Sequence, residues 1–127
     1  MEKKTILVVD DDKNIIQHIS LILERVGYTV FEAPDVNTAI HLIFLKTPDL
    51  VILKLMLPQG NISEICQLLK NDKKYQKIPI VILNAKINED GKLIGEMMDV
   101  QEYITKPFNT GDFINKIKNI IKTEMEM

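Results

Sequence analysis

The sequence predicts an α/β fold, in which a parallel β-sheet is covered by helices on both faces. Five short runs of apolar and β-branched residues have the length of strands, and they occupy residues 5–9, 29–33, 50–53, 80–83 and 102–105. Between them, apolar residues recur at the spacing of amphipathic helices. Strands that are apolar without interruption are typical of parallel sheets buried on both faces. The alternation of strand and helix therefore favours a doubly wound α/β domain.

The first half of the chain contains three of the expected strands and two helices. Helical spacing over residues 15–26 follows the first strand, and Gly27 stands where a left-handed helix end is expected. A second helix is predicted over residues 36–43, with Pro34-Asp35 at its start. Pro48-Asp49 then interrupts the chain before the third strand, which is expected to be buried on both faces.

The second half continues the pattern less regularly. Helical spacing returns over residues 62–69, whereas residues 86–99 are more polar and predict a short fourth helix. Asn109 is the expected N-cap of the last helix. The core face of that helix should consist of Phe113, Ile114, Ile117, Ile120 and Ile121. Residues 124–127 are expected to form a frayed tail, so that the domain comprises residues 1–123.

Composition limits the possible functions. A chain of 127 residues suits one domain, and a net charge of −2 without a long basic run argues against nucleic-acid binding. The single cysteine, Cys66, excludes an internal disulfide and indicates the cytoplasm; it is expected to be half-buried on a helix. His18 and His41 are expected on solvated helix faces. No signal peptide or membrane span is predicted.

Polar residues directly follow four of the expected strands. In open parallel sheets, functional crevices lie beyond the carboxyl ends of the strands. The residues at these positions are Asp10, Asp11 and Asp12 after the first strand, Lys54 after the third, Asn84 after the fourth and Lys106 after the fifth. We therefore expect these side chains to form the functional site.

At these positions the chain resembles the response-regulator receiver family, and the resemblance covers essentially all of the sequence. The matching segments are residues 6–12, 48–53, 56–58, 78–81 and 103–108. The resemblance implies a flavodoxin-like (βα)5 fold, a five-stranded sheet with strand order 2-1-3-4-5. It also implies a cis peptide bond between Lys106 and Pro107, an isomer that is common only before proline.

The resemblance further implies functional roles. In typical receivers, an aspartate at the end of the third strand accepts a phosphoryl group from a histidine kinase, and an acidic pair after the first strand holds Mg²⁺. Asp10 and Asp11 match that acidic pair, and Lys106 matches a lysine that contacts the phosphoryl oxygens. Tyr103 occupies the position of an aromatic switch residue.

Two positions depart from the family pattern. Lys54 stands in place of the acceptor aspartate, and Asn84 stands in place of the switch Thr or Ser. An ammonium group cannot become an acyl phosphate. The charge of the pocket also falls to near zero, or near −1 if Asp12 points inward, so Mg²⁺ binding by Asp10 and Asp11 should be weak or abolished. We therefore hypothesise that the Lys54 ammonium occupies the place of the metal and binds the acidic pair.

Three functions follow from this interpretation. The first is a phosphorylation-independent interaction module in two-component (phosphorelay) signalling, which binds a histidine kinase or an effector, or forms a homodimer. Its binding face would be the fourth helix, fifth strand and fifth helix. The second is a switch that is phosphorylated, with Mg²⁺, on Asp10, Asp11 or Asp12. The third, a small enzyme, is disfavoured because the sequence has no nucleophile–base pair and no glycine-rich phosphate loop.

Overall fold

The computed structural model describes residues 3–54, 62–84, 102–105 and 108–125. Its strands are β1 (Thr5–Val9), β2 (Thr29–Ala33), β3 (Leu50–Lys54), β4 (Ile80–Asn84) and β5 (Glu102–Thr105). Its helices are α1 (Lys13–Arg25), α2 (Val36–Lys46), α3 (Ile62–Asn71) and α5 (Thr110–Met125). Every predicted strand is present, with ends that agree to within one residue.

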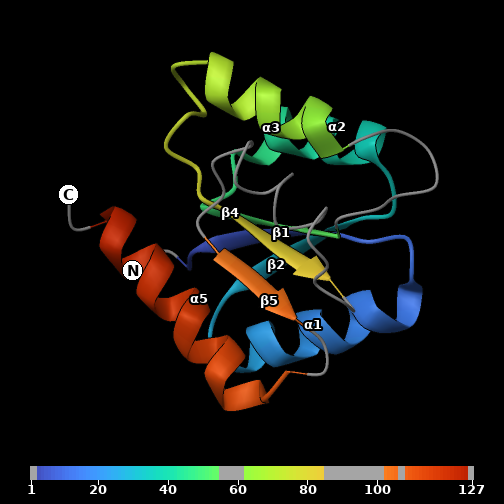
Figure 1. The fold of residues 1–127 in the computed structure, drawn as a ribbon, viewed down its shortest axis with the longest axis vertical. Helices are drawn as coiled ribbons and strands as arrows, with labels where there is room; N and C mark the ends of the chain where they lie inside the picture. The colour runs from blue at the N-terminus through green and yellow to red at the C-terminus, as the bar shows by residue number, and fades with distance from the viewer. Residues whose placement is uncertain (1–2, 55–61, 85–101, 106–107, 126–127) are drawn as a thin grey trace.

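The five strands form one parallel sheet in the order β2-β1-β3-β4-β5, as predicted. Figure 1 shows α1 and α5 on one face of this sheet and α2 and α3 on the other. The register pairs Val9 with Leu53 and Lys54 with Leu83, which brings the carboxyl ends of the three central strands to one edge. The predicted flavodoxin-like architecture is therefore confirmed.

Alternating strand residues supply two separate cores, because successive side chains of a strand point to opposite faces of the sheet. On one face, Leu7, Val9, Val51 and Leu53 pack with residues of α2 and α3. On the other face, the buried residues include Ile6, Val8, Leu50, Ile52, Phe113 and Ile117. The central strand β3 is apolar on both sides as a result, which explains its uninterrupted run of hydrophobic residues.

Polar side chains cap the starts of the helices, and residues in the left-handed conformation follow the ends of two of them. Asp12 and Asp35 cap the starts of α1 and α2. Asn109 Oδ1 accepts a hydrogen bond of 3.0 Å from the Asp112 N–H at the start of α5, as the sequence predicts. Gly27, at φ 102°, follows α1 in the expected left-handed conformation. Thr47 also ends α2 in this conformation, at φ 44°, which is unusual for a β-branched residue.

Several expectations need correction or stay open. Cys66 is 2% exposed, so it belongs to the core and is not half-buried. The helix α5 extends to Met125, so residues 124 and 125 are helical where a frayed tail was expected. His18 and His41 are exposed, as predicted.

Two expectations lie outside the described residues: the fourth helix over residues 86–99 and the cis bond at Lys106–Pro107. None of the helices that the structure describes is long and apolar enough to span a membrane.

Candidate functional site

Asp10 anchors the site at the carboxyl end of β1. Its backbone N–H donates to the Ala33 carbonyl at 3.1 Å, which continues the ladder between β1 and β2. Its side-chain Oδ1 accepts a hydrogen bond of 2.9 Å from the Asp12 N–H. Asp10 is only 1% exposed, so its carboxylate is held inside the protein at a defined orientation. A carboxylate in such a position needs a nearby cation or hydrogen-bond donors.

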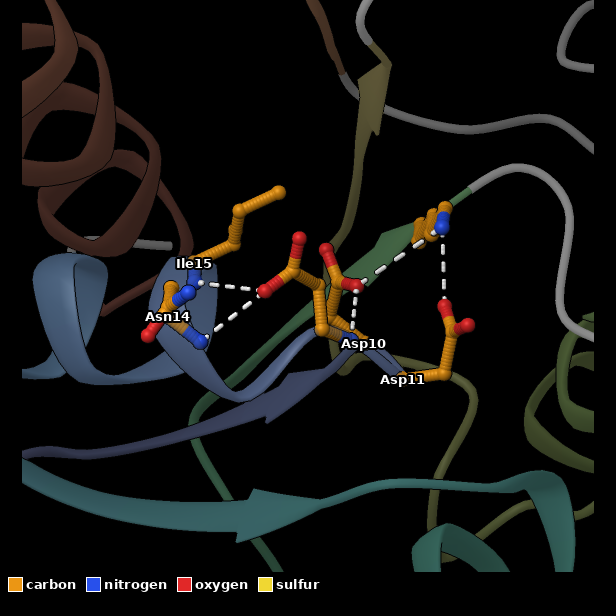
Figure 2. A network of polar contacts seen from close by, with 6 residues as sticks. Asp10, Asp11, Asn14 and Ile15 are labelled. Carbon is orange, nitrogen blue, oxygen red and sulfur yellow. Dashed lines mark hydrogen bonds and ion pairs between the residues drawn. The ribbon is translucent and has the colours of Figure 1, made fainter.

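Lys54, the last residue of β3, brings a cation to this carboxylate. Since Leu53 pairs with Val9 in the sheet, the residue after each of them lies at the same edge. The Lys54 ammonium nitrogen Nζ is 2.8 Å from Asp11 Oδ1 and 3.9 Å from Asp10 Oδ1 (Figure 2). The sequence-based hypothesis that Lys54 binds the acidic pair therefore agrees with the geometry.

The two contacts of Lys54 differ in kind. The pair with Asp11 is a charged hydrogen bond, and both side chains are about one-third exposed, 32% for Lys54 and 33% for Asp11. The Asp10 carboxylate is 2% exposed, and its Oδ1 is 3.9 Å from the Lys54 ammonium nitrogen, a distance that allows an ion pair but no hydrogen bond. The sequence did not predict this asymmetry, because the backbone turn after β1 decides which of two adjacent carboxylates reaches the ammonium group.

Asp12 has a separate role. Its Oδ1 accepts hydrogen bonds from the N–H groups of Asn14, at 2.9 Å, and Ile15, at 3.4 Å (Figure 2). These are the contacts of an N-cap, which satisfies otherwise unpaired N–H groups at the start of α1. The carboxylate acts on Lys54 only through space, and more weakly than those of Asp10 and Asp11.

The ion pair shifts both titrations in the direction of mutual stabilisation. The hydrogen bond from Lys54 lowers the pKa of Asp11 below its ordinary value of 3.8, against a smaller opposing effect of desolvation. The hydrogen bond to Asp11 raises the pKa of Lys54 above 10.5, with further attraction from the Asp10 charge. Both groups are therefore charged throughout the neutral range, and the ammonium group stays available to neutralise the acidic pair.

The described residues do not fit Mg²⁺ well. This ion requires oxygen ligands in near-octahedral geometry, and a cation is already bound between the two available carboxylates. The ammonium group of Lys54 cannot itself coordinate a metal, and its positive charge offsets part of the negative charge of the acidic pair. Within the part of the chain that the structure describes, no group of three or more His, Cys, Asp or Glu side chains is placed to hold a metal.

The remaining predicted site residues are placed only in part. Asn84 ends β4 directly opposite Thr105 of β5, and Tyr103 pairs with Ile82 in the same ladder. The backbone of Asn84 thus lies at the same edge of the sheet as Lys54, whose partner in β4 is Leu83. The side chains of Asn84 and Tyr103, and the whole of Lys106, lie outside the described structure.

A parallel sheet in the order 2-1-3-4-5, with an acidic pair beyond β1, is typical of the receiver class of signalling domains. The model of the response regulator receiver domain family matches residues 6–118. The chain therefore belongs to the response regulator receiver domain family, whose members take part in two-component signalling.

One relative supports this assignment by its sequence, and one solved structure shows the same fold. The phosphate regulon transcriptional regulatory protein PhoB of Pseudomonas aeruginosa is 38% identical over 122 residues, which are 96% of this chain and 53% of that protein. A CheY-like receiver domain protein from Methanospirillum hungatei superposes with a TM-score of 0.89 at 23% identity, covering 98% of each chain.

The response regulator DrrB of Thermotoga maritima, described as an OmpR/PhoB homologue, gives a TM-score of 0.83 at 27% identity. The match covers 97% of this chain and 54% of DrrB. The chain thus spans about half the length of PhoB and of DrrB.

Proposed function

We propose that this receiver domain works as a phosphorylation-independent protein-interaction module. The observation that carries the proposal is the position of Lys54, at the end of β3, with its ammonium nitrogen 2.8 Å from Asp11. The family resemblance puts the acceptor aspartate at this residue. An amine there cannot form the acyl phosphate on which a receiver switch depends, and its charge takes the role of a bound cation.

The ion pair also supports a single resting conformation. A switch needs two states of similar free energy that a modification can bias. In this pocket the charged hydrogen bond between Lys54 and Asp11 is present without any modification, and the Asp10 carboxylate is already neutralised from one side. A pocket whose charges are satisfied internally has less to gain from phosphate or metal.

The partners would be signalling proteins. We propose a histidine kinase or a downstream effector that binds the face formed by the fourth helix, β5 and α5, or a second copy of the chain on the same face. The domain would act by binding in the cytoplasm rather than by catalysing a reaction, and it would need neither Mg²⁺ nor another cofactor.

A second candidate is a switch that is phosphorylated on another aspartate. The exposure of the three carboxylates favours Asp11 for this role, because it is 33% exposed whereas Asp10 is 2% exposed. Asp12 is engaged in capping α1. Phosphorylation of Asp11 would replace its carboxylate charge with that of a phosphoryl group, so this alternative predicts that Lys54 pairs with phosphoryl oxygens in the modified protein.

Incubation with acetyl phosphate and Mg²⁺, followed by intact-mass spectrometry, separates the two candidates. We expect no phosphoryl adduct on the wild-type protein and an adduct on Lys54→Asp, which restores a carboxylate at the acceptor position. A wild-type adduct that disappears in Asp11→Asn would replace the proposal with the second candidate. An unmodified Lys54→Asp, beside a competent receiver that is modified in the same reaction, would show that Lys54 is not the cause of inactivity.

A further inference from the structure

The C-terminal end of α2 presents apolar side chains to solvent. Phe44 is 50% exposed and Leu45 is 62% exposed. The preceding residue of the helix, Ile43, points into the core and is fully buried. The helix is apolar on more than one side, because Ile40 and Leu42 are also partly buried against the core. Exposed apolar side chains mark an interaction site where they form a contiguous patch that is rimmed by polar residues.

The connection from α3 to β4 adjoins these side chains. The ring of Phe44 contacts the ring of Tyr75 edge-on, with centroids 5.6 Å apart. The Lys74 ammonium lies 5.5 Å from the centre of the Tyr75 ring, and the Lys46 ammonium lies 5.2 Å from the centre of the Phe31 ring. Figure 1 shows α2 and α3 side by side on this face of the sheet. The two segments therefore form one continuous surface.

We call this region the α2–α3 surface and define it by its apolar centre and its lysine rim. The centre consists of Phe44 and Leu45. By its lysine rim we mean Lys46, which follows Leu45 in the chain, and four lysines of the segment that runs from the end of α3 past Tyr75, namely Lys70, Lys73, Lys74 and Lys77. Lys46, Lys73, Lys74 and Lys77 are exposed. The arrangement matches the usual anatomy of a protein interface, in which an apolar core is surrounded by polar residues.

The α2–α3 surface is basic although the protein is acidic. The only acidic residue between positions 70 and 77 is Asp72, and its Oδ1 accepts a hydrogen bond of 2.8 Å from the Lys74 N–H. Five lysines and one aspartate give this surface a charge of +4. Since the whole chain has a net charge of −2, the rest of the molecule has a charge of −6. The two segments that meet at the contact between Phe44 and Tyr75 therefore carry a net positive charge.

We propose that the α2–α3 surface docks an acidic amphipathic helix of a partner protein. Leucine or phenylalanine side chains on one face of that helix would pack on Phe44 and Leu45, and glutamates beside them would meet the lysine rim. Recognition of a helix by apolar anchors with flanking charges is a common mode of peptide binding. This surface lies on the face of the sheet opposite α1 and α5, so it is distinct from the face proposed above for signalling partners.

Two other anionic partners fit the surface less well. A single fourteen-carbon acyl chain gives only marginal membrane binding, and the two partly exposed side chains offer less apolar surface for insertion. A long anionic membrane or nucleic acid would extend past this surface and come close to the rest of the molecule, which has a charge of −6. A small protein segment meets only the basic surface, because charges beyond about 8 Å are screened at physiological salt.

The test uses a synthetic acidic peptide and amide NMR. The peptide has about 16 residues, so that it can form a helix, with leucines along one face and glutamates elsewhere. We expect it to shift the amide resonances of residues 41–46 and 72–77. Phe44→Ser/Leu45→Ser should weaken binding by about fivefold or more, as expected for loss of an interface anchor. Neutralising Lys73, Lys74 and Lys77 by glutamine should weaken binding and reduce its salt dependence.

Matched controls come from the other face of the sheet. Leu21 on α1 is 50% exposed, like Phe44, so Leu21→Ser should leave the peptide affinity unchanged. Lys116→Gln/Lys118→Gln on α5 is the control for charge. The proposal is overturned if up to about 1 mM peptide shifts no amide, or if both sets of variants lose affinity equally. Equal binding to a scrambled peptide, or binding only to vesicles that contain phosphatidylserine, would also overturn it.

Discussion

Replacement of Lys54 by methionine tests whether the ammonium group acts as an internal cation. The substitution keeps an unbranched side chain of similar length and removes only the charge and its hydrogen bond to Asp11. In the variant, the carboxylates of Asp10 and Asp11 remain close together without Lys54 to neutralise them. We expect Lys54→Met to lower the free energy of unfolding at neutral pH.

The distances give the size of this effect. At an effective dielectric constant of 20, a unit charge pair attracts by about 6 kcal/mol at the 2.8 Å distance to Asp11. The attraction is about 4 kcal/mol at the 3.9 Å distance to Asp10. Water competes for both groups, because Lys54 is 32% exposed, and desolvation opposes the gain. The net loss in the free energy of unfolding should lie between the losses typical of exposed and of buried ion pairs, at about 1–2 kcal/mol.

Urea unfolding followed by circular dichroism measures this loss, since the chain has no tryptophan for fluorescence. Addition of about 10 mM Mg²⁺ should stabilise Lys54→Met more than the wild type, because only the variant lacks the Lys54 ammonium group beside the acidic pair. Lys118→Met, an exposed position on α5, is the control and should change stability by less than about 0.5 kcal/mol.

The loss should also depend on pH. The pKa of Asp11 is lowered in the folded protein, so the ion pair contributes stability above the ordinary pKa of 3.8 and loses it as the pH falls through the folded-state value. The difference between wild type and Lys54→Met should therefore shrink in acid. A variant as stable as the wild type at neutral pH, with no response to Mg²⁺, would refute the internal-cation explanation.

Three further predictions concern residues of the fold outside the site. Thr47→Gly should stabilise the protein by about 0.5–1 kcal/mol in urea unfolding, because it relieves a left-handed conformation at φ 44°; an unchanged or lower stability would contradict this strain. Asn109→Ala should cost about 1 kcal/mol by removing the cap of α5, and a variant with wild-type stability would show that the cap contributes little. Burial raises the pKa of Cys66 to about 11, so its thiol should react with Ellman's reagent at pH 8 only after unfolding; rapid reaction of the native protein would contradict this burial.

The strands could be predicted from the sequence because their environment is simple. Every residue of β3 from Leu50 to Leu53 is buried, so an uninterrupted apolar run was both necessary and recognisable. The caps at Asp35 and Asn109 combine a favourable residue type with a position just before a helical pattern. In these places local preference and tertiary structure agree.

The prediction for Cys66 was wrong because the burial of this residue depends on which side of α3 faces the sheet. Ile65, Cys66 and Leu69 form the buried stripe of α3, whereas Leu68 is only partly buried. Cysteine gives a weak hydrophobic signal, so the full burial of Cys66 could not be predicted from the periodicity alone. The left-handed Thr47 was likewise not predictable, since this residue type disfavours the conformation that it adopts.

The site could be predicted as a set of residues but not as a geometry. Parallel strand order requires the residues after β1 and β3 to lie together, which identified Lys54 beside the acidic pair. Which carboxylate forms the short contact depends on the turn between β1 and α1. In that turn, Asp10 accepts the Asp12 N–H and Asp12 caps the helix, which leaves Asp11 to meet the ammonium group.

The most direct test of the central claim is an amide NMR titration of the wild-type protein with Mg²⁺ and then beryllofluoride, which mimics a phosphoryl group. If the Lys54 ammonium occupies the place of the cation, the resonances of Asp10, Asp11 and Lys54 should not move at either step. Shifts of these resonances with Mg²⁺, followed by further shifts that reach Tyr103 with beryllofluoride, would show that the pocket still works as a phosphoryl switch and would contradict the account.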